Sequence, residues 1–264
     1  MINEIITRIT NLIPIERIYL STFEYQNTKV KELSILMRNT SKLHIIEAKP
    51  LVEMIMNGYP EYKSRMFYTQ EVYQAIAQGS MVFYSICREE NLVYLSPDST
   101  DVISVVALSA NEVLCNANVS LQKEVKKIGG FREGAAFYIE QNNQLLAAFM
   151  LHQVIELSFR TAELLVIGKE KVSHSIRNHQ KLMKHYVAEM GSVFNDQDDQ
   201  EMILLALLDD AYRCVRYEND YEVSREELLF FVQKADLIGE RLIDLYEIVI
   251  AQFEQNFIGN NECL

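Results

Sequence analysis

The sequence predicts an α+β fold: a small α/β domain at residues 1–98, followed by an all-α bundle of up-and-down helices at residues 101–264. Short strand-like and helical patterns alternate in the first part, whereas only helical periodicity is found in the second. Between them, residues 96–100 are dense in turn formers and mark the expected boundary. With 264 residues, 49% of them hydrophobic, the chain can fill the cores of two domains.

The first domain is expected to begin with a helix, because isoleucines recur at helical spacing in residues 2–12. Pro14 stops this helix, and the alternation of Ile15, Arg17 and Tyr19 then predicts a strand. Further strands are expected at 33–37, 43–47, 66–68, 81–87 and 92–95, and further helices at 51–56 and 71–77.

The second domain is expected to consist of helices alone. Their predicted bounds are 102–127, 131–142, 145–167, 176–190, 201–217 and 225–257. The last helix has the clearest start signal, because Ser224 and Glu227 have the spacing of a capping box, in which each side chain accepts a hydrogen bond from the other's backbone amide.

The charge distribution bounds the kinds of ligand that the chain can bind. A formal charge of −12, from 25 Lys and Arg against 37 Asp and Glu, argues against a protein that coats nucleic acid over its whole surface. Any anion site must therefore be local. Residues 160–188 contain six basic and two acidic residues, whereas residues 189–210 contain seven acidic residues and no basic one. This asymmetry indicates either a local anion site or a solvated helix face.

The cysteines and the hydropathy pattern indicate a cytoplasmic protein. Cys87, Cys115, Cys214 and Cys263 are far apart, without the spacing of a zinc site or of a disulfide framework. Reduced thiols are therefore expected. No run approaches the roughly 18 apolar residues that span a bilayer, so the sequence predicts no membrane helix and no signal peptide.

Three polar residues, His152, Gln153 and Glu156, lie on an otherwise apolar predicted helix. Leaving such groups buried and unpaired costs roughly 1–3 kcal/mol each, so we expect a satisfied polar network inside the bundle. His152 and Glu156 have the spacing of a metal-ligand pair, but no second pair accompanies them, and no metal or cofactor is implied. His174 is expected either to do related work at a helix start or to be a solvent-facing turn residue.

Three segments of the second half occur in the order and spacing of a known pattern. They are residues 148–156, which contain Leu-His-Gln-x-x-Glu, residues 173–177 at a helix start, and residues 212–217 ahead of the final helix. In this combination the second half resembles the HEPN family, the nucleotide-binding helical bundles of higher eukaryotes and prokaryotes. The resemblance implies a bundle that binds a nucleotide or single-stranded RNA, and a homodimer.

The first half looks like the nucleotidyltransferase-like domain that often precedes HEPN bundles, in its size, its position and its closing segment 77–84. An active transferase of that family has a Gly-Ser turn after its first strand and an Asp-x-Asp pair on the next strand. Here Ser21 and Thr22 are expected in the turn, and Glu32 and Ser34 at the acidic pair. Two-metal phosphoryl transfer needs several carboxylates, and serine supplies no charge. The domain is therefore predicted to be degenerate.

Many HEPN toxins cut RNA with an Arg-x(4–6)-His motif on a bundle helix, in which Arg stabilises the phosphorane and His moves protons. The second half lacks this motif, because Arg177 is too close to His179 and too far from His185. The one formal match, Arg38 to His44, falls in the first half. Ribonuclease activity without a metal is therefore disfavoured, and whether the chain is an enzyme stays open.

The leading hypothesis is a degenerate nucleotidyltransferase-like domain followed by a HEPN bundle that binds a nucleotide or RNA without catalysis. The predicted contacts combine cationic side chains with aromatic rings, and they are His174, Arg177, Arg213, Arg216 and Tyr217. Arg216 has the alternative of pairing with a nearby aspartate. The rival hypotheses are a ribonuclease or nucleotidyltransferase of a toxin–antitoxin-like system, and a protein-interaction module without nucleotide affinity.

Overall fold

The computed structural model describes residues 1–25, 28–99, 108–217 and 221–259, and for residues 23–25, 28–30, 216 and 217 it describes the backbone alone. The fold is α+β, as predicted: an N-terminal sheet region is followed by a region of long packed helices. Contacts between residues divide the chain into two compact units, Met1–Ala117 and Asn118–Leu264, which we call the sheet unit and the helical unit. The domain assignments at 1–98 and 101–264 stay predictions.

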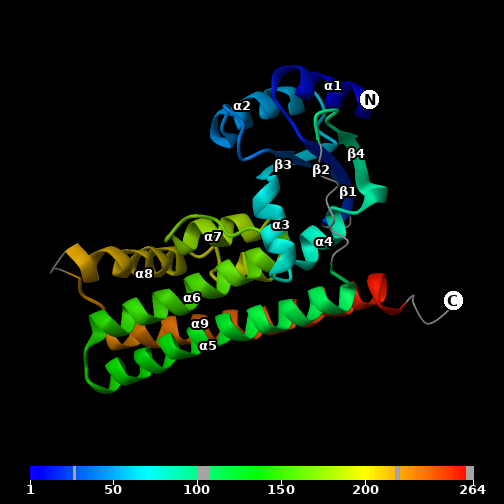
Figure 1. The fold of residues 1–264 in the computed structure, drawn as a ribbon. Coiled ribbons are helices and arrows are strands. Elements are labelled where there is room, and N and C mark those ends of the chain that lie inside the picture. The colour runs from blue at the N-terminus through cyan, green and yellow to red at the C-terminus, as the bar shows by residue number, and fades with distance from the viewer. Residues whose placement is uncertain (26–27, 100–107, 218–220, 260–264) are drawn as a thin grey trace. The chain divides into compact units, whose positions relative to one another are not determined.

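The sheet unit is built around a four-stranded mixed sheet with strand order β3-β2-β1-β4 (Figure 1). β1 is antiparallel to β2 and β4, whereas β2 is parallel to β3. The strands are β1 (Arg17–Tyr25), β2 (Thr28–Met37), β3 (Tyr62–Tyr68) and β4 (Leu92–Leu95). The helices are α1 (Ile2–Leu12), α2 (Ile45–Met56), α3 (Thr69–Ala77) and α4 (Met81–Ile86), with a short 3-10 helix at Glu89–Asn91.

The two faces of this sheet differ in chemistry. Ile18 of β1 lies on one face, in a buried apolar cluster with residues of α1 and α2. Because alternate residues of a strand face opposite sides of the sheet, Glu32 and Ser34 share a face of β2, and both are buried. α4 packs against the sheet through Phe83, whose ring meets Phe67 of β3 edge-on at 4.9 Å between centroids.

Two strands predicted in the sheet unit are wrong. The segment 81–87 forms α4, where the Ser80 side chain accepts a hydrogen bond from the backbone N–H of Phe83. The segment 43–47 contains the start of α2, where His44 and Glu47 form a capping box. A short apolar run is compatible with a strand or with a buried helix, so periodicity alone could not separate the two.

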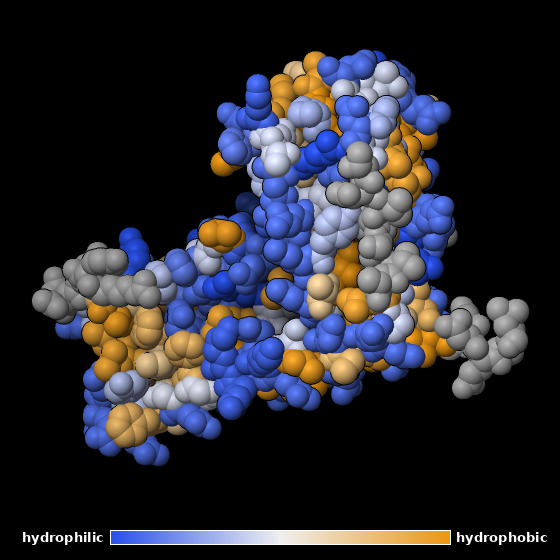
Figure 2. Space-filling view, in the orientation of Figure 1, coloured by the Kyte–Doolittle hydropathy of each residue, from blue (hydrophilic) through white to orange (hydrophobic). Residues whose placement is uncertain are grey.

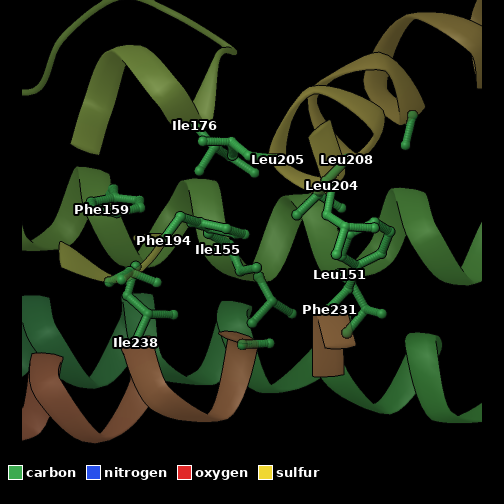
Figure 3. Packing of buried hydrophobic residues seen from close by; sticks show 14 of the residues in the cluster. Leu151, Ile155, Phe159, Ile176, Phe194, Leu204, Leu205, Leu208, Phe231 and Ile238 are labelled. Carbon is green, nitrogen blue, oxygen red and sulfur yellow. The ribbon is translucent and has the colours of Figure 1, made fainter. Parts of the chain in front are cut away.

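The helical unit is organised around α6, which packs against α7, α8 and α9 (Figure 1). In its core, Leu151, Ile155 and Phe159 of α6 lie in one buried cluster with Leu208 of α8 and Phe231 of α9 (Figure 3). The helices are α5 (Ala110–Glu140), which begins in the sheet unit, α6 (Gln144–Ile167), α7 (Ile176–Met183), α8 (Asp199–Tyr217) and α9 (Arg225–Phe257), with a short 3-10 helix at Met190–Ser192.

The helices predicted at 102–127 and 131–142 are one helix, α5, in the part of the chain that the structure describes. Residues 102–107 lie outside the described residues. Gly129 and Gly130 lie inside α5, and a Cβ atom at either position would meet no neighbour within 4 Å. The helix continues through both glycines, although each costs about 1 kcal/mol in helix propensity.

The predicted start of the last helix is confirmed. The Ser224 hydroxyl accepts a hydrogen bond from the backbone N–H of Glu227, and the Glu227 carboxylate accepts one from the backbone N–H of Ser224. The helix predicted at 176–190 is shorter, because α7 ends at Met183.

The thiols and the hydropathy of the helices complete the description of the fold. Cys87, Cys115 and Cys214 form no disulfide bond within the described residues, and Cys263 lies outside them. None of the described helices combines the length and the apolar character that crossing a membrane requires.

Gly191 provides a test of the packing in the helical unit. A Cβ atom there would lie 2.3 Å from Lys184 Cα, so Gly191→Ala has to displace backbone. We expect this change to lower the free energy of unfolding by about 1–3 kcal/mol. Gly239→Ala in α9, where a Cβ atom meets nothing within 4 Å, should instead raise it by up to about 1 kcal/mol. Urea denaturation measures both, and equal effects would contradict the packing.

Candidate functional site

Ionisable side chains are buried along one side of α6. His152, Glu156 and Glu163 are 0%, 1% and 0% exposed, and their spacing of four and then seven residues places them on the same helix face. Asn143 caps the start of α6 with its side chain, and Gly168, with a φ of 79°, ends it. Because buried ionisable groups need partners, the segments that pack against this face have to supply them.

His152 is hydrogen-bonded through both ring nitrogens. Its Nε2 lies 2.9 Å from the backbone oxygen of His174, and its Nδ1 lies 3.1 Å from Nε2 of Gln153. A carbonyl oxygen only accepts and an amide nitrogen only donates, so His152 carries its proton on Nε2 and is neutral. Burial lowers the pKa of His152, against the opposing effect of Glu156 and Asp209, which agrees with the neutral form.

Glu156 connects His152 to the surface. It accepts a hydrogen bond from Gln153 Nε2 at 3.2 Å, and its other oxygen lies 3.2 Å from His174 Nδ1 and 3.4 Å from Arg160 Nη1. His152, Gln153 and Glu156 therefore form one hydrogen-bonded network, and His174 belongs to it.

An aromatic pair lies at the exposed end of this network. The rings of His174 and Tyr212 are stacked, with 4.1 Å between centroids and 17° between planes, and we call this pair the His174–Tyr212 stack. The His174 side chain is 56% exposed, whereas Glu156, which holds its Nδ1, is buried. The stack is therefore accessible to solvent at His174, and the buried Glu156 carboxylate fixes the orientation of the His174 ring through its Nδ1.

Asp209 of α8 holds the start of α7 beside the stack. Its carboxylate accepts hydrogen bonds from Ser175 Oγ at 2.8 Å and from the backbone N–H of Ile176 at 2.6 Å. It also lies 3.8 Å from His152 Nε2. A carboxylate at a helix N-terminus is favourable, so Asp209 fixes α7, α8 and the stack relative to one another.

A second buried network follows about two turns later on α6. His179 Nδ1 lies 2.7 Å from Glu163 Oε1, and His179 Nε2 lies 3.0 Å from the backbone oxygen of Ser173. The other Glu163 oxygen accepts from the backbone N–H of Lys171 at 2.6 Å. Burial lowers the pKa of His179, but the hydrogen bond and the charge of Glu163 outweigh burial and leave this pKa raised.

The predicted arginine contacts have partners of their own. Arg177 is exposed and donates to the backbone oxygen of Met202 at 3.1 Å. Arg213 is exposed and pairs with Asp210 at 2.5 Å. Arg216 and Tyr217 are the last two residues of α8, and their side chains lie outside the described part of the chain.

Several members of the two networks were not singled out from the sequence. Asp209 and Tyr212 come from α8, and Glu163 and His179 form a pair across α6 and α7. The spacing of His152, Glu156 and Glu163 on one helix face was a usable signal for α6. The partners of that face had no signal, because they depend on which segments pack there.

Arg160 is the one Arg or Lys residue of α6. Its Nε and Nη2 bind the two oxygens of Glu170 at 2.9 and 2.7 Å, and its Nη1 reaches Glu156. Two carboxylates therefore share one guanidinium, which reduces the positive charge that Arg160 offers to an anion.

In the sheet unit, the residues predicted at the turn and at the acidic pair have structural roles. Ser21 and Thr22 lie within β1 and not in a turn, which corrects that prediction. Glu32 is buried and ion-paired with Arg65, whose Nε lies 2.6 Å from Glu32 Oε1. A carboxylate neutralised in this way is a poor cation ligand. Among the described residues, no group of three or more His, Cys, Asp or Glu side chains is arranged to hold a metal ion.

The formal Arg-x(4–6)-His match of the sheet unit is not assembled as a pair. Arg38 donates to the backbone oxygen of Asp98 and lies 3.6 Å from Glu16. His44 is instead the N-cap residue of α2, with its Nδ1 3.4 Å from the Tyr68 hydroxyl. The two residues therefore have separate structural roles.

Comparison with models of known protein families finds no match for this chain. No curated protein has significant sequence similarity to it.

The two buried histidines make opposite contributions to stability as pH changes. Because the pKa of His152 is lowered on folding, the unfolded state binds the proton more tightly, and stability is lost as pH falls below about 6.5. We expect the difference in unfolding free energy between wild type and His152→Gln to shrink as pH falls from 7.5 to 5. Each unit of lowering contributes about 1.4 kcal/mol. Urea denaturation across this range measures the difference, and a constant difference would exclude a buried neutral His152.

Proposed function

We propose that the helical unit is a HEPN-like bundle that binds a nucleotide or single-stranded RNA at the His174–Tyr212 stack, without catalysing phosphoryl transfer. The observation that carries the proposal is the stack itself, a half-exposed imidazole parallel to a tyrosine ring at 4.1 Å. Bases stack on such rings whatever their sequence, because every base has a π-face. The resemblance of segments 148–156, 173–177 and 212–217 to HEPN bundles supports the same ligand class.

The position of His174 supports a role in stacking. Glu156 holds its Nδ1 at 3.2 Å, and the backbone oxygen of the same residue is held by His152 at 2.9 Å. The ring therefore loses little conformational entropy when a base stacks on it, which favours binding.

Arg177 supports the proposal that the site contacts the phosphate groups of its ligand. It lies three residues after His174, in the first turn of α7, and its partner is a carbonyl oxygen, which does not cancel its charge. Arg213 is paired with Asp210, so it contributes less positive charge. Arg216 and Tyr217 stay predicted contacts.

The sheet unit supports a non-catalytic role. Phosphoryl transfer with two metal ions needs unpaired carboxylates, and the Glu32 carboxylate is bound by Arg65. We therefore propose that the nucleotidyltransferase-like domain is degenerate.

The resemblance also supports a homodimer. Exposed apolar side chains are available on the long helices of the helical unit, and Figure 2 shows such residues at its surface. They include Phe137 of α5 and Leu229, Ile243 and Ile248 of α9.

Substitution of His174 tests the stacking site. We expect His174→Ala to weaken binding of ATP or a short single-stranded RNA about 5- to 100-fold, because base–aromatic stacking contributes roughly 1–3 kcal/mol. His174→Phe keeps an aromatic ring and should bind within a few-fold of wild type. Fluorescence anisotropy of labelled ligands, measured across a salt series, gives these affinities.

The matched control is His185→Ala, which removes an exposed histidine just beyond α7. It should leave affinity unchanged. If wild type binds neither ligand at low salt, the proposal fails, and a protein-interaction module becomes the better account. If both His174 variants bind as wild type does, the stack is not the site.

One observation favours a second candidate function, RNA cleavage without a metal ion. Glu156 Oε1 contacts both His174 Nδ1 and Arg160 Nη1, so a histidine and an arginine share one carboxylate. His174 Nε2 would then accept a proton from a 2′-hydroxyl, and Arg160 would stabilise the phosphorane. We rank this candidate second because Glu170 and Glu156 already neutralise Arg160.

Incubation of wild type with end-labelled RNA in excess EDTA separates the two candidates. The binding proposal predicts no cleavage above background. Cleavage by wild type that His174→Phe reduces at least about 100-fold, while binding is retained, would replace it with the ribonuclease. His174→Phe is suited to this comparison because it preserves the ring and removes the proton-transfer group.

A further inference from the structure

The segment that carries His174 is held at two successive backbone carbonyls. His179 Nε2 lies 3.0 Å from the oxygen of Ser173, and His152 Nε2 lies 2.9 Å from the oxygen of His174. Both histidines are completely buried, one on α7 and one on α6. Two imidazole N–H groups therefore fix the backbone on both sides of the stacking residue.

The two histidines hold these carbonyls in different protonation states. His152 is neutral, because Gln153 donates to its Nδ1. His179 faces an acceptor at each nitrogen, Glu163 at Nδ1 and Ser173 at Nε2, so both nitrogens have to donate. An imidazole is more basic than a carboxylate, so the proton between His179 and Glu163 belongs to the histidine. His179 is therefore an imidazolium buried against a carboxylate.

The surroundings of His179 identify Glu163 as its counter-charge. Glu163 of α6 is the carboxylate in contact, and Glu156 lies two turns earlier on the same helix. The segment before α7 contributes the Ser173 oxygen and the backbone N–H of Lys171, which binds Glu163. The Phe159 ring stacks on the imidazole at 6.4 Å.

Asp209 of α8 binds the C-terminal end of the segment that carries His174. Asp209 accepts from Ser175 and Ile176, and its charge bears on His152. Within the described residues, Glu163 is thus the carboxylate that bonds His179 directly.

We infer that His179 is a positioning residue for the His174–Tyr212 stack, and that ligand binding at the stack weakens when His179 loses its proton. The inference rests on the proposed function for its ligand. The mechanism rests on the hydrogen bonds alone. A neutral His179 can donate from one nitrogen only. If Nε2 keeps the proton, the Nδ1 lone pair faces the Glu163 carboxylate. If Nδ1 keeps it, the half-buried Ser173 carbonyl loses its charged donor.

The direction of the pH dependence follows from these contacts. The pKa of His179 is raised above its ordinary value of about 6.5, although burial alone would lower it. The hold on Ser173 is therefore complete below about pH 6.5 and is lost as pH rises through the raised pKa. Binding at the stack should fall in the same range, by about tenfold for one hydrogen bond to a charged group.

Glu163→Gln is the variant that isolates the proton. The amide oxygen of Gln can accept from the Lys171 backbone N–H, and its NH₂ group can donate to Nδ1 of a neutral His179. His179 then keeps its Nε2 proton for the Ser173 carbonyl at every pH above 6. Every hydrogen bond is preserved, but none of them depends on an imidazolium.

The experiment uses the full chain and compares wild type, Glu163→Gln and the control His185→Gln between pH 6 and pH 9. Affinity for labelled ATP and a short single-stranded RNA is measured by anisotropy, and amide hydrogen exchange is measured over residues 169–176. We expect wild type and His185→Gln to lose about tenfold in affinity and in exchange protection with rising pH. Glu163→Gln should stay level. Effects of pH on other groups are common to all three proteins and cancel.

The outcomes separate this inference from the proposed function. Exchange protection that depends on pH in wild type but not in Glu163→Gln, with no ligand bound at any pH, would overturn the proposed function and leave the hold on Ser173 intact. Exchange protection and binding that do not change with pH in wild type, or change equally in Glu163→Gln, would overturn the inference. If Glu163→Gln does not fold, ¹⁵N-histidine NMR of wild type decides: a singly protonated His179 at pH 6 overturns it.

Discussion

The burial of ionisable side chains on α6 is the constraint on which the helical unit depends. His152, Glu156 and Glu163 lie in an apolar core, where one uncompensated charge costs roughly 3–5 kcal/mol. Their partners come from the segment before α7, from α7 itself and from α8. Burial of apolar residues such as Leu151 and Phe159 stabilises the fold, but these side chains can pack against many different neighbours. The buried polar groups need partners of matching hydrogen-bonding chemistry, so they decide which segments pack against α6.

Buried ionisable side chains have different partners in the two units. In the sheet unit, Glu32 forms an ion pair with Arg65, and the two charges neutralise each other. In the helical unit, the buried carboxylates hold rings and backbone, and one ring, that of His174, stays accessible at the surface. A satisfied interior that presents an ordered ring is suited to recognising a ligand, because the cost of ordering the contact is met during folding.

The sequence predicts long helices better than short elements. The expected bounds 145–167 and 225–257 agree with α6 and α9 within one residue, because apolar periodicity over many turns has one explanation. The runs 43–47 and 81–87 were expected as strands and belong to helices, because a few apolar residues fit either structure. The helices expected at 102–127 and 131–142 are one helix, α5, which runs through Gly129 and Gly130 despite the low helix propensity of glycine.

The sequence by itself determined that the chain is α+β, that its second half is helical, and that His152, Gln153 and Glu156 need partners inside it. Only the tertiary structure decided which groups those partners are. His152 lies next to the carbonyl of His174 and the carboxylate of Asp209, and Glu156 lies next to the guanidinium of Arg160. The reason is physical. Helical periodicity is a property of neighbours in the chain, whereas the partner of a buried polar group depends on which distant segments pack against it.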